Sequence, residues 1–303
     1  MRLIVPKQSR YYSKKRSSWG QKKPLILLLA VPFSLFILSF TIPLFYGIGL
    51  SFYNARGSFV GLANYLSLFH DEKFWNSLTY TITYSVVVAG VMSFLGLFIG
   101  VFINRLGSGD RFVKSIMLIP WAISLTAWGL LGQIVFSRQF GIVNDLLMRL
   151  RLTRQGIPWL GNPSVAKLTI MLSRIYKDVW FSALLFLVAR QTIPYELYEE
   201  GRVSGANAWQ IFWKITFPLL RTTMLYVGII LLIFALQEFD LVYALTRGGP
   251  GFATETAAVT IYRNGVLYGN YEYGTAVAAM WSLIITVIVI IFFAPLQMRA
   301  IER

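Results

Sequence analysis

Residues 79–103 read TYTITYSVVVAGVMSFLGLFIGVFI, a run of 25 residues without a charged side chain. A helix rises about 1.5 Å per residue, so about 20 apolar residues cross the roughly 30 Å of hydrocarbon in a bilayer. Backbone polar groups in lipid must be satisfied within the segment, which favours a helix. The run therefore predicts a membrane-spanning helix.

Similar apolar runs occur along the whole chain of 303 residues. Together they predict six spans, at about 25–46, 79–103, 113–136, 166–189, 224–245 and 274–296. The period-two alternation that is typical of a membrane β-barrel is missing. We therefore expect an all-α membrane protein, with residues 1–24 as a basic tail and residues 25–303 as one transmembrane domain.

The composition supports this class and excludes several kinds of chemistry. Hydrophobic residues make up 56% of the chain and charged residues 14%, whereas a soluble domain is about a quarter charged. The chain has no cysteine and one histidine, which excludes disulfides, zinc–thiolate sites and cysteine nucleophiles. It also lacks a G-x-x-x-x-G-K-[ST] loop for nucleotide phosphates. We expect no catalytic residue, no metal site and no cofactor in this chain.

The net charge of +15 comes from basic residues that lie next to apolar runs. This pattern is typical of membrane topology signals, so we do not expect nucleic-acid binding. Lys and Arg crowd the region before residue 25, which predicts a cytoplasmic N-terminus and an uncleaved first span. Six spans then place the C-terminus and the loops 104–112 and 190–223 in the cytoplasm. One outer loop departs from the bias and carries Arg138, Arg149, Arg151 and Arg154.

The loop 190–223 has the sequence of two short helices joined at glycine. One helix ends near Gly201 or Gly205, and Asn207 caps a second helix, which covers 208–216 and ends before Pro218. In the second helix an aromatic stripe recurs at the spacing of a helix face, formed by Trp209, Phe212 and Trp213. A hairpin with its aromatic side chains in the lipid headgroups is an alternative interpretation.

The same loop resembles a family signature. Glu199, Gly205, Ile215 and Pro218 match the pattern E-A-A-x3-G-x9-I-x-L-P of membrane subunits of ATP-binding-cassette (ABC) importers. Three positions differ from the pattern: its two alanines are Glu200 and Gly201 here, and its leucine is Phe217.

Three further segments resemble the carbohydrate branch of these importers, of the maltose and glycerol-phosphate type. Residues 59–65 read FVGLANY, residues 159–163 read WLGNP, and residues 239–250 read FDLVYALTRGGP before TET at 254–256. The order and spacing of these segments identify the chain as a member of this branch, with the type I importer transmembrane fold.

The resemblance implies a multi-pass permease of the bacterial inner membrane that takes up a sugar or sugar derivative. Its expected partners are a second homologous permease, an ABC ATPase dimer that holds ATP and magnesium, and an extracytoplasmic sugar-binding protein, besides membrane lipid. The loop 190–223 would dock into the ATPase. The residues expected to couple the two subunits are Glu199, Glu200, Gly205, Ala206, Trp209, Ile215 and Pro218.

Charged residues inside predicted spans are costly and usually face protein or a water-filled path. Arg174 and Asp178 are four residues apart and can pair, and Arg174 is a weak indication of an anionic sugar. Alternatively, these charges snorkel to an interface or join this subunit to its partner. The candidates for a substrate path are Trp128, Gln133, Arg174, Lys177, Asp178, Trp180, Gln237, Glu238, Asp240 and Tyr243.

Two other points remain from the sequence. Gly96 and Gly100 have the G-x-x-x-G spacing that lets helices approach closely, which predicts a packing role.

An ion-coupled secondary transporter or a channel is the alternative function. The inverted repeats with broken helices, and filter sequences such as T-V-G-Y-G, that are typical of that class are not found. A membrane enzyme is a third possibility, which the scarcity of histidine and cysteine disfavours.

Overall fold

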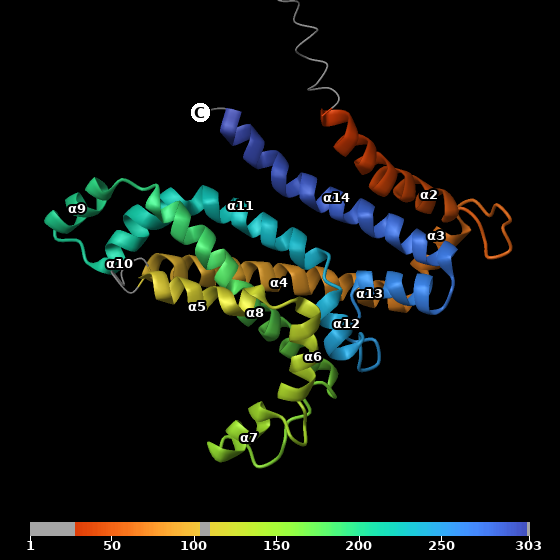
Figure 1. The fold of residues 1–303 in the computed structure, drawn as a ribbon, viewed down its shortest axis with the longest axis horizontal. Coiled ribbons are helices and arrows are strands. Elements are labelled where there is room, and N and C mark those ends of the chain that lie inside the picture. Colours follow the sequence, from red (N-terminus) through yellow and green to blue (C-terminus); the bar gives the residue numbers. More distant parts are fainter. Residues whose placement is uncertain (1–27, 104–109, 302–303) are drawn as a thin grey trace, which may run out of the picture. The chain divides into compact units, whose positions relative to one another are not determined.

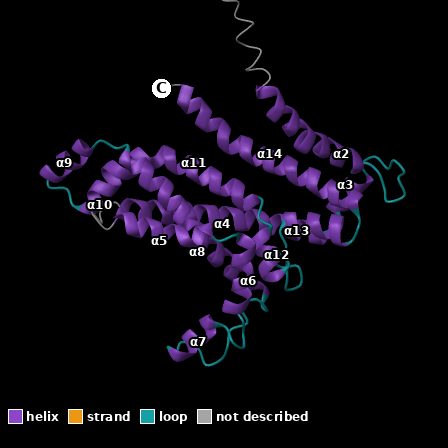
Figure 2. Ribbon diagram, viewed as in Figure 1, coloured by secondary structure: helices purple, strands orange, loops and turns teal. Residues whose placement is uncertain are grey.

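A computed structural model describes residues 28–103 and 110–301, and these ranges are largely helical (Figures 1 and 2). The tail 1–24, most of the predicted loop 104–112 and residues 302–303 lie outside the described residues. The named helices, with η for π-helical turns, are η1 (Ile37–Thr41), α2 (Ile42–Leu50), α3 (Ala63–Phe69), α4 (Glu72–Ile103), α5 (Asp110–Ala122), α6 (Leu125–Val135), α7 (Ile142–Arg149), α8 (Pro163–Gln191), α9 (Tyr195–Val203), α10 (Ala208–Ile211), η3 (Phe212–Thr216), α11 (Phe217–Leu236), α12 (Asp240–Thr246), α13 (Ala257–Tyr262), η4 (Arg263–Leu267) and α14 (Tyr271–Ile301).

The described residues fall into two units, which divide between Gly49 and Leu50. Within the described residues, four continuous helices are long and apolar enough to cross a membrane. They are Leu28–Leu50, Glu72–Ile103, Ala208–Leu236 and Tyr271–Phe292. The broken helix Ser115–Ala122 and Leu125–Val135 is a fifth candidate if its two parts count as one span.

The fourth predicted span coincides with α8, which has 29 residues. It is not among the apolar helices because Arg174, Lys177 and Asp178 lie near its middle. The total of six spans and the cytoplasmic termini therefore stay predictions.

The third predicted span, 113–136, is wrong as a continuous helix. The chain bends by 89° between α5 and α6. Ser124 has an extended conformation there, and its Oγ accepts a hydrogen bond from the amide of Ala127 (3.2 Å), which caps α6. Pro120 near the end of α5 removes a backbone donor. These polar interruptions end the helix inside a run that is apolar overall.

The fifth predicted span, 224–245, has the wrong bounds, because the apolar helix in this region runs over Ala208–Leu236. α11 ends at Leu236, and α12 begins at Asp240 after a break. In that break the Glu238 carboxylate accepts a hydrogen bond from the amide of Leu241 (3.0 Å) and so caps α12. The buried Glu238 carboxylate thus gains a hydrogen-bond donor, and the helix is interrupted between α11 and α12.

The predicted second helix of the loop, 208–216, does not end before Pro218. It continues through η3 into α11, and Pro218 occupies the first turn of α11. A proline ring clashes with the carbonyl of the residue four positions earlier in an α-helix. That residue is Lys214, which lies in the wider π-helical turn. The first helix, α9, likewise passes Gly201 and ends at Val203.

The core of residues 50–303 is the packing of α4 on α8, and α11 contacts both of these helices (Figure 1). A Cβ atom added at Gly96 would overlap the Oγ of Ser182, and one at Gly100 would overlap the carbonyl oxygen of Ala183. Ser182 Oγ donates a hydrogen bond to the carbonyl of Met92 (2.7 Å) across this contact. The predicted packing role of the two glycines is confirmed.

The two ends of α4 contact different loops. At one end, Phe98 near the end of α4 packs on Phe212 of η3, with ring centroids 5.1 Å apart. At the other end, Asn76 near the start of α4 donates a hydrogen bond to the carbonyl of Phe252 (2.7 Å). The loop 190–223 and the loop 247–256 therefore lie at opposite ends of α4.

Substitution of Gly96 by leucine should destabilise the α4–α8 contact. Overpacking a tight contact costs about 1–3 kcal/mol, so we expect a lower melting temperature for the purified protein in detergent. Gly90→Ala in the same helix is the matched control, because no atom lies within 4 Å of its added Cβ. Equal melting temperatures for Gly96→Leu and Gly90→Ala would contradict the packing role.

Candidate functional site

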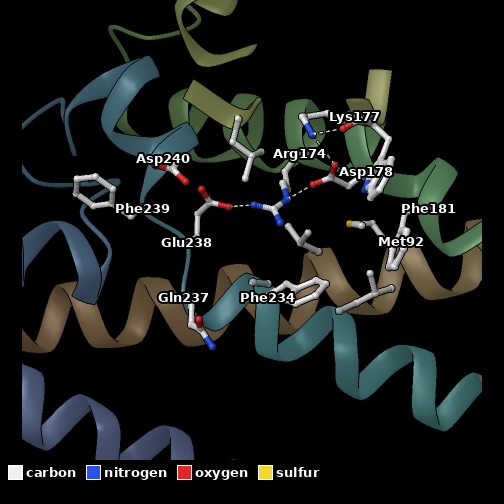
Figure 3. A pocket seen from close by; sticks show the side chains of 15 residues that line it. Met92, Arg174, Lys177, Asp178, Phe181, Phe234, Gln237, Glu238, Phe239 and Asp240 are labelled. Carbon is white, nitrogen blue, oxygen red and sulfur yellow. Dashed lines mark hydrogen bonds and ion pairs between the residues drawn. The ribbon is translucent and has the colours of Figure 1, made fainter. Parts of the chain in front are cut away.

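Four charged side chains meet inside the helical core, from the middle of α8 and from the break between α11 and α12 (Figure 3). Arg174 forms an ion pair with Glu238 through Nη1 and with Asp178 through Nε, the latter at 2.6 Å. Lys177 Nζ lies 2.9 Å from Asp178 Oδ1 and donates to the carbonyl oxygen of Trp121 (3.2 Å). The predicted Arg174–Asp178 pair is confirmed.

Glu238 connects the ion cluster to the other helices. Its Oε2 accepts a hydrogen bond from the hydroxyl of Tyr84 on α4 (3.1 Å), besides the ion pair with Arg174. Its backbone carbonyl accepts from Thr256 Oγ1 just before α13 (2.8 Å). Through one residue, α4, α8, α12 and the start of α13 are therefore held together.

The cluster is buried and balanced. Arg174, Lys177, Asp178 and Glu238 are all less than 9% exposed, and their formal charges sum to zero. An unpaired charge in an apolar interior costs several kcal/mol, so each of these groups depends on its partners. The charges do not snorkel to an interface, as one interpretation of the sequence had it.

A cavity of about 410 Å³ lies against this cluster. Its aromatic wall includes Trp121 and Phe181, whose rings stack with centroids 5.4 Å apart and planes 8° apart. Trp121 is 45% exposed, and Gln237 and Asp240 are also exposed. The full lining is Val88, Met92, Trp121, Leu125, Arg174, Lys177, Asp178, Phe181, Leu231, Phe234, Ala235, Gln237, Glu238, Phe239 and Asp240.

Six of the ten predicted path residues line this cavity and four do not. The four that do not are Trp128, Gln133, Trp180 and Tyr243. Trp128 stacks on Tyr176, and its Nε1 donates to Ser173 Oγ (2.9 Å). Gln133 Nε2 donates to the carbonyl of Ala244 (2.6 Å) and so ties α6 to α12. Tyr243 stacks on Phe239, with centroids 5.2 Å apart.

Reasoning from the sequence missed three residues of the ion cluster and the cavity wall: Tyr84, Trp121 and Phe181. Tyr84, which binds Glu238, is fully buried, and Tyr80 stands one turn earlier on the same helix. A tyrosine hydroxyl inside an apolar span needs a hydrogen-bond partner, so a tyrosine in such a run could have indicated a buried polar contact. Trp121 and Phe181 lack such a signal, because aromatic residues are common throughout these spans.

The loop 190–223 forms the separate pair α9 and α10. Asn207 caps α10 through a capping box with Gln210, as predicted, and Gly205 between the two helices has φ +78°. Among the seven predicted coupling residues, Glu199, Glu200, Gly205, Trp209 and Pro218 are exposed, whereas Ala206 and Ile215 are half-buried.

The aromatic stripe of this loop is divided between core and surface. Phe212 is 5% exposed and packs on Phe98, so this member of the stripe belongs to the core. Trp209 and Trp213 remain 61% and 39% exposed. Tyr198 of α9 is also buried, and its hydroxyl forms a hydrogen bond with Thr216 Oγ1 of η3 (3.3 Å). The pair therefore has an anchored base, formed by Phe212 and Tyr198, and an exposed rim that includes Trp209 and Trp213.

The segments that resemble the importer family at the opposite end of α4 form ordered loops. Asn64 Nδ2 donates to the carbonyls of Ser51 and Tyr53, both at 2.8 Å. In the loop 247–256, Thr254 Oγ1 donates to the carbonyl of Gly249 (2.7 Å). Burial raises the pKa of Glu255, and a hydrogen bond from Thr260 and the charge of Arg263 oppose that shift.

Removal of the Glu238 carboxylate should destabilise the protein strongly. Glu238→Ala leaves Arg174 and Lys177 sharing one buried carboxylate, and breaking a buried pair costs about 3–5 kcal/mol. Asp240→Ala is the control: its carboxylate is exposed in the same break, so we expect a change within about 0.5 kcal/mol. Thermal unfolding in detergent, followed by tryptophan fluorescence, measures both. Similar shifts for both variants would refute the role of Glu238.

The two glycines of the loop should respond oppositely to alanine. Gly205→Ala forces a side chain into a left-handed conformation, at a cost of about 1–2 kcal/mol. Gly201→Ala should gain about 1 kcal/mol of helix propensity. The tightest contact of its Cβ would be the flexible end of Ile215 at 3.0 Å, and Ile211 would lie in ordinary contact at 3.5 Å. Limited proteolysis of the loop reports both effects. Faster cleavage of Gly201→Ala than of Gly205→Ala would contradict this geometry.

Known proteins share both the sequence and this fold. Residues 92–303 match the family described as binding-protein-dependent transport system inner membrane component. The sulfoquinovosyl glycerol transport system permease protein SmoG of Agrobacterium fabrum is 36% identical over 73% of this chain and 71% of its own length. The trehalose/maltose transport system permease protein MalF of Thermococcus litoralis is 32% identical over 77% of this chain and 78% of its own length.

Among solved structures, a chain of a bacterial ABC transporter involved in the import of the acidic polysaccharide alginate superposes with a TM-score of 0.81. It is 25% identical, and the match covers 92% of this chain and 98% of that chain. The all-α fold is thus that of a type I ABC importer transmembrane domain. The chain belongs to the family of inner membrane components of binding-protein-dependent transport systems.

Proposed function

We propose that this chain is the permease subunit of an ATP-driven, binding-protein-dependent importer of a sugar or sugar derivative. The similar proteins are permeases named for sulfoquinovosyl glycerol and for trehalose or maltose. The observation that carries the proposal is the pair α9–α10, an anchored and exposed element of family sequence at one end of the helical core. An ion-coupled transporter has no separate ATPase for such an element to contact, so this alternative is not favoured.

The assembly that we propose contains four kinds of subunit. A second permease completes the path, and an ABC ATPase dimer holds ATP and magnesium. An extracytoplasmic binding protein delivers the solute, as in the alginate transporter crystallised with a periplasmic protein that binds an alginate pentasaccharide. The loops 51–71 and 247–270 lie at the end of α4 opposite to α9–α10, where a delivering protein would bind.

The pair α9–α10 is proposed to transmit motion from the ATPase. Glu199 and Glu200 are exposed on α9, and Trp209 is exposed at the start of α10. Carboxylates and a tryptophan form the kind of rim that binds a groove with basic and apolar parts. Because Phe212 and Tyr198 anchor the pair to α4 and η3, a displacement of the pair would move these helices with it.

The cavity is proposed to lie on the substrate path and to favour a hydroxylated ligand without a net negative charge. Arg174 and Lys177 are both paired with carboxylates, so neither cation is open to an anion. Asp240 adds an exposed negative charge, Trp121 offers a ring face and Gln237 an amide. Aromatic faces and amides are common partners of sugar rings and hydroxyls. The pairing of Arg174 with two carboxylates therefore supports a ligand other than an anionic sugar.

Reversal of charge at Glu199 should uncouple transport from ATP hydrolysis. In the reconstituted assembly, Glu199→Lys should insert normally but lose at least tenfold in transport per ATP hydrolysed, because the docking contact becomes repulsive. Glu196→Lys is the matched control, since Glu196 is exposed on the same helix but lies outside the family pattern. Solute uptake and phosphate release are measured together. Native coupling in Glu199→Lys would disprove the docking role.

A further inference from the structure

The segment 138–154 between α6 and α8 has a fixed shape of its own. Its centre is Asn144 of α7, which is 1% exposed. The Nδ2 of Asn144 donates to the carbonyls of Ser137, Arg138 and Ile157, at 3.1–3.3 Å. Its Oδ1 accepts from the amide of Ile157 (3.0 Å) and from Trp159 Nε1 (2.9 Å). One buried amide therefore holds α7 and both connections to the spanning helices.

The outer surface of this segment is strongly apolar. We name its five exposed side chains the α7 ridge: Phe140, Ile142, Leu146, Leu150 and Leu152, which are 55–71% exposed. Ile142, Leu146 and Leu150 follow one another at intervals of four residues and so share one side of the helix. An apolar patch of this size in water is unfavourable, so the ridge needs a covering partner.

The same surface is basic. Arg138, Arg149, Arg151 and Arg154 are all exposed, and Asp145 is the one acidic residue of the segment, so its net charge is 4 − 1 = +3. Only Arg149 pairs with Asp145, at 2.7 Å, and both side chains are more than half exposed. Leu150, Arg151 and Leu152 are consecutive and all exposed, so apolar and cationic side chains are neighbours on this surface.

These arginines oppose the usual distribution of charge. Gln133 binds Ala244 of α12, and α12 leads into the loop 247–256, so α6 and α7 lie toward the end opposite to α9–α10. If α9–α10 is cytoplasmic, the arginines are on the outer side, where Lys and Arg are normally depleted. Their presence there calls for a specific anionic partner.

We infer that residues 138–154 form a membrane-interface element, in which the α7 ridge enters the acyl boundary and the arginines bind the phosphates of anionic phospholipid headgroups. An amphipathic helix with an apolar face and flanking arginines has this chemistry. Continuity with α6 and α8, which belong to the predicted spans 113–136 and 166–189, would keep the element near the membrane surface. Alternation of leucine and arginine fits a boundary between acyl chains and phosphates better than the separated core and rim of a protein interface.

Site-directed spin labelling tests the inference directly, because the chain has no native cysteine. Ile142→Cys and Leu146→Cys place a nitroxide on the ridge, and Gln155→Cys places one on an exposed polar control position. The purified full chain is reconstituted in vesicles of phosphatidylcholine alone or of phosphatidylcholine with phosphatidylglycerol. Collision rates with oxygen and with a water-soluble nickel chelate then report the depth of each label.

With phosphatidylglycerol, both ridge labels should favour oxygen over nickel several-fold more than the control label. This preference should fall in phosphatidylcholine alone, and likewise when Arg149, Arg151 and Arg154 are all replaced by glutamine. Ridge labels as accessible to nickel as the control would overturn the inference. So would labels that become buried only after the binding protein or a second permease is added. Equal depth in both vesicles and in the glutamine variant would overturn the headgroup assignment.

The depth of a label does not depend on transport. The proposed function can therefore fail in uptake assays while the interface element is upheld, and the reverse is also possible. Circular dichroism of each variant checks that the Asn144-centred fold is retained, and the labelled positions are exposed, so the labels do not enter the core.

Discussion

The ion pair between Arg174 and Glu238 is the constraint on which the rest of the structure depends. It joins the middle of α8 to the break between α11 and α12, and both side chains are more than 90% buried. Two charges in an apolar interior are tolerated only when paired and hydrogen-bonded, so the elements that supply Asp178, Tyr84 and the Leu241 amide are also held in place. The break in the helix is thus a consequence of satisfying Glu238.

This arrangement gives the cavity a rigid wall and a more exposed rim. The paired charges form the wall, while Trp121, Gln237 and Asp240 remain exposed. At the far end of the same helices, tight glycine contacts between α4 and α8 lead to the anchored base of α9–α10. Packed cores respond to displacement as units, so a movement at the loop reaches the cavity through helices that have little freedom to bend.

Much of the fold follows from the sequence, because uninterrupted apolar length is a strong signal. The run 79–103 lies within the helix Glu72–Ile103, and the Asn207 cap lies where it was predicted. The predictions failed where a local polar group interrupts an apolar run, as Ser124 and Glu238 do. Mean hydropathy over a long window does not detect a single polar residue in an apolar run. Such a residue can still be recognised, because its side chain needs a hydrogen-bond partner.

The candidate site was harder to predict for a different reason. Spanning helices are apolar on all sides, since lipid and protein core are alike in polarity, so periodicity does not tell which face looks inward. Trp128 and Gln133 were therefore assigned to the cavity although they pack between helices. The charged residues of the cavity were predicted more reliably, because the free-energy cost of a charge in lipid forces these side chains to face protein or water.

The ion cluster also sets an order for biogenesis. Arg174 leaves the ribosome 64 residues before its partner Glu238, and α8 alone is not apolar enough to qualify as a spanning helix. Until α11 and α12 have been synthesised, α8 carries charges that only Asp178 can offset. We therefore expect α8 to enter the lipid late, beside the translocon, as a pair with the segment that brings its counter-charge.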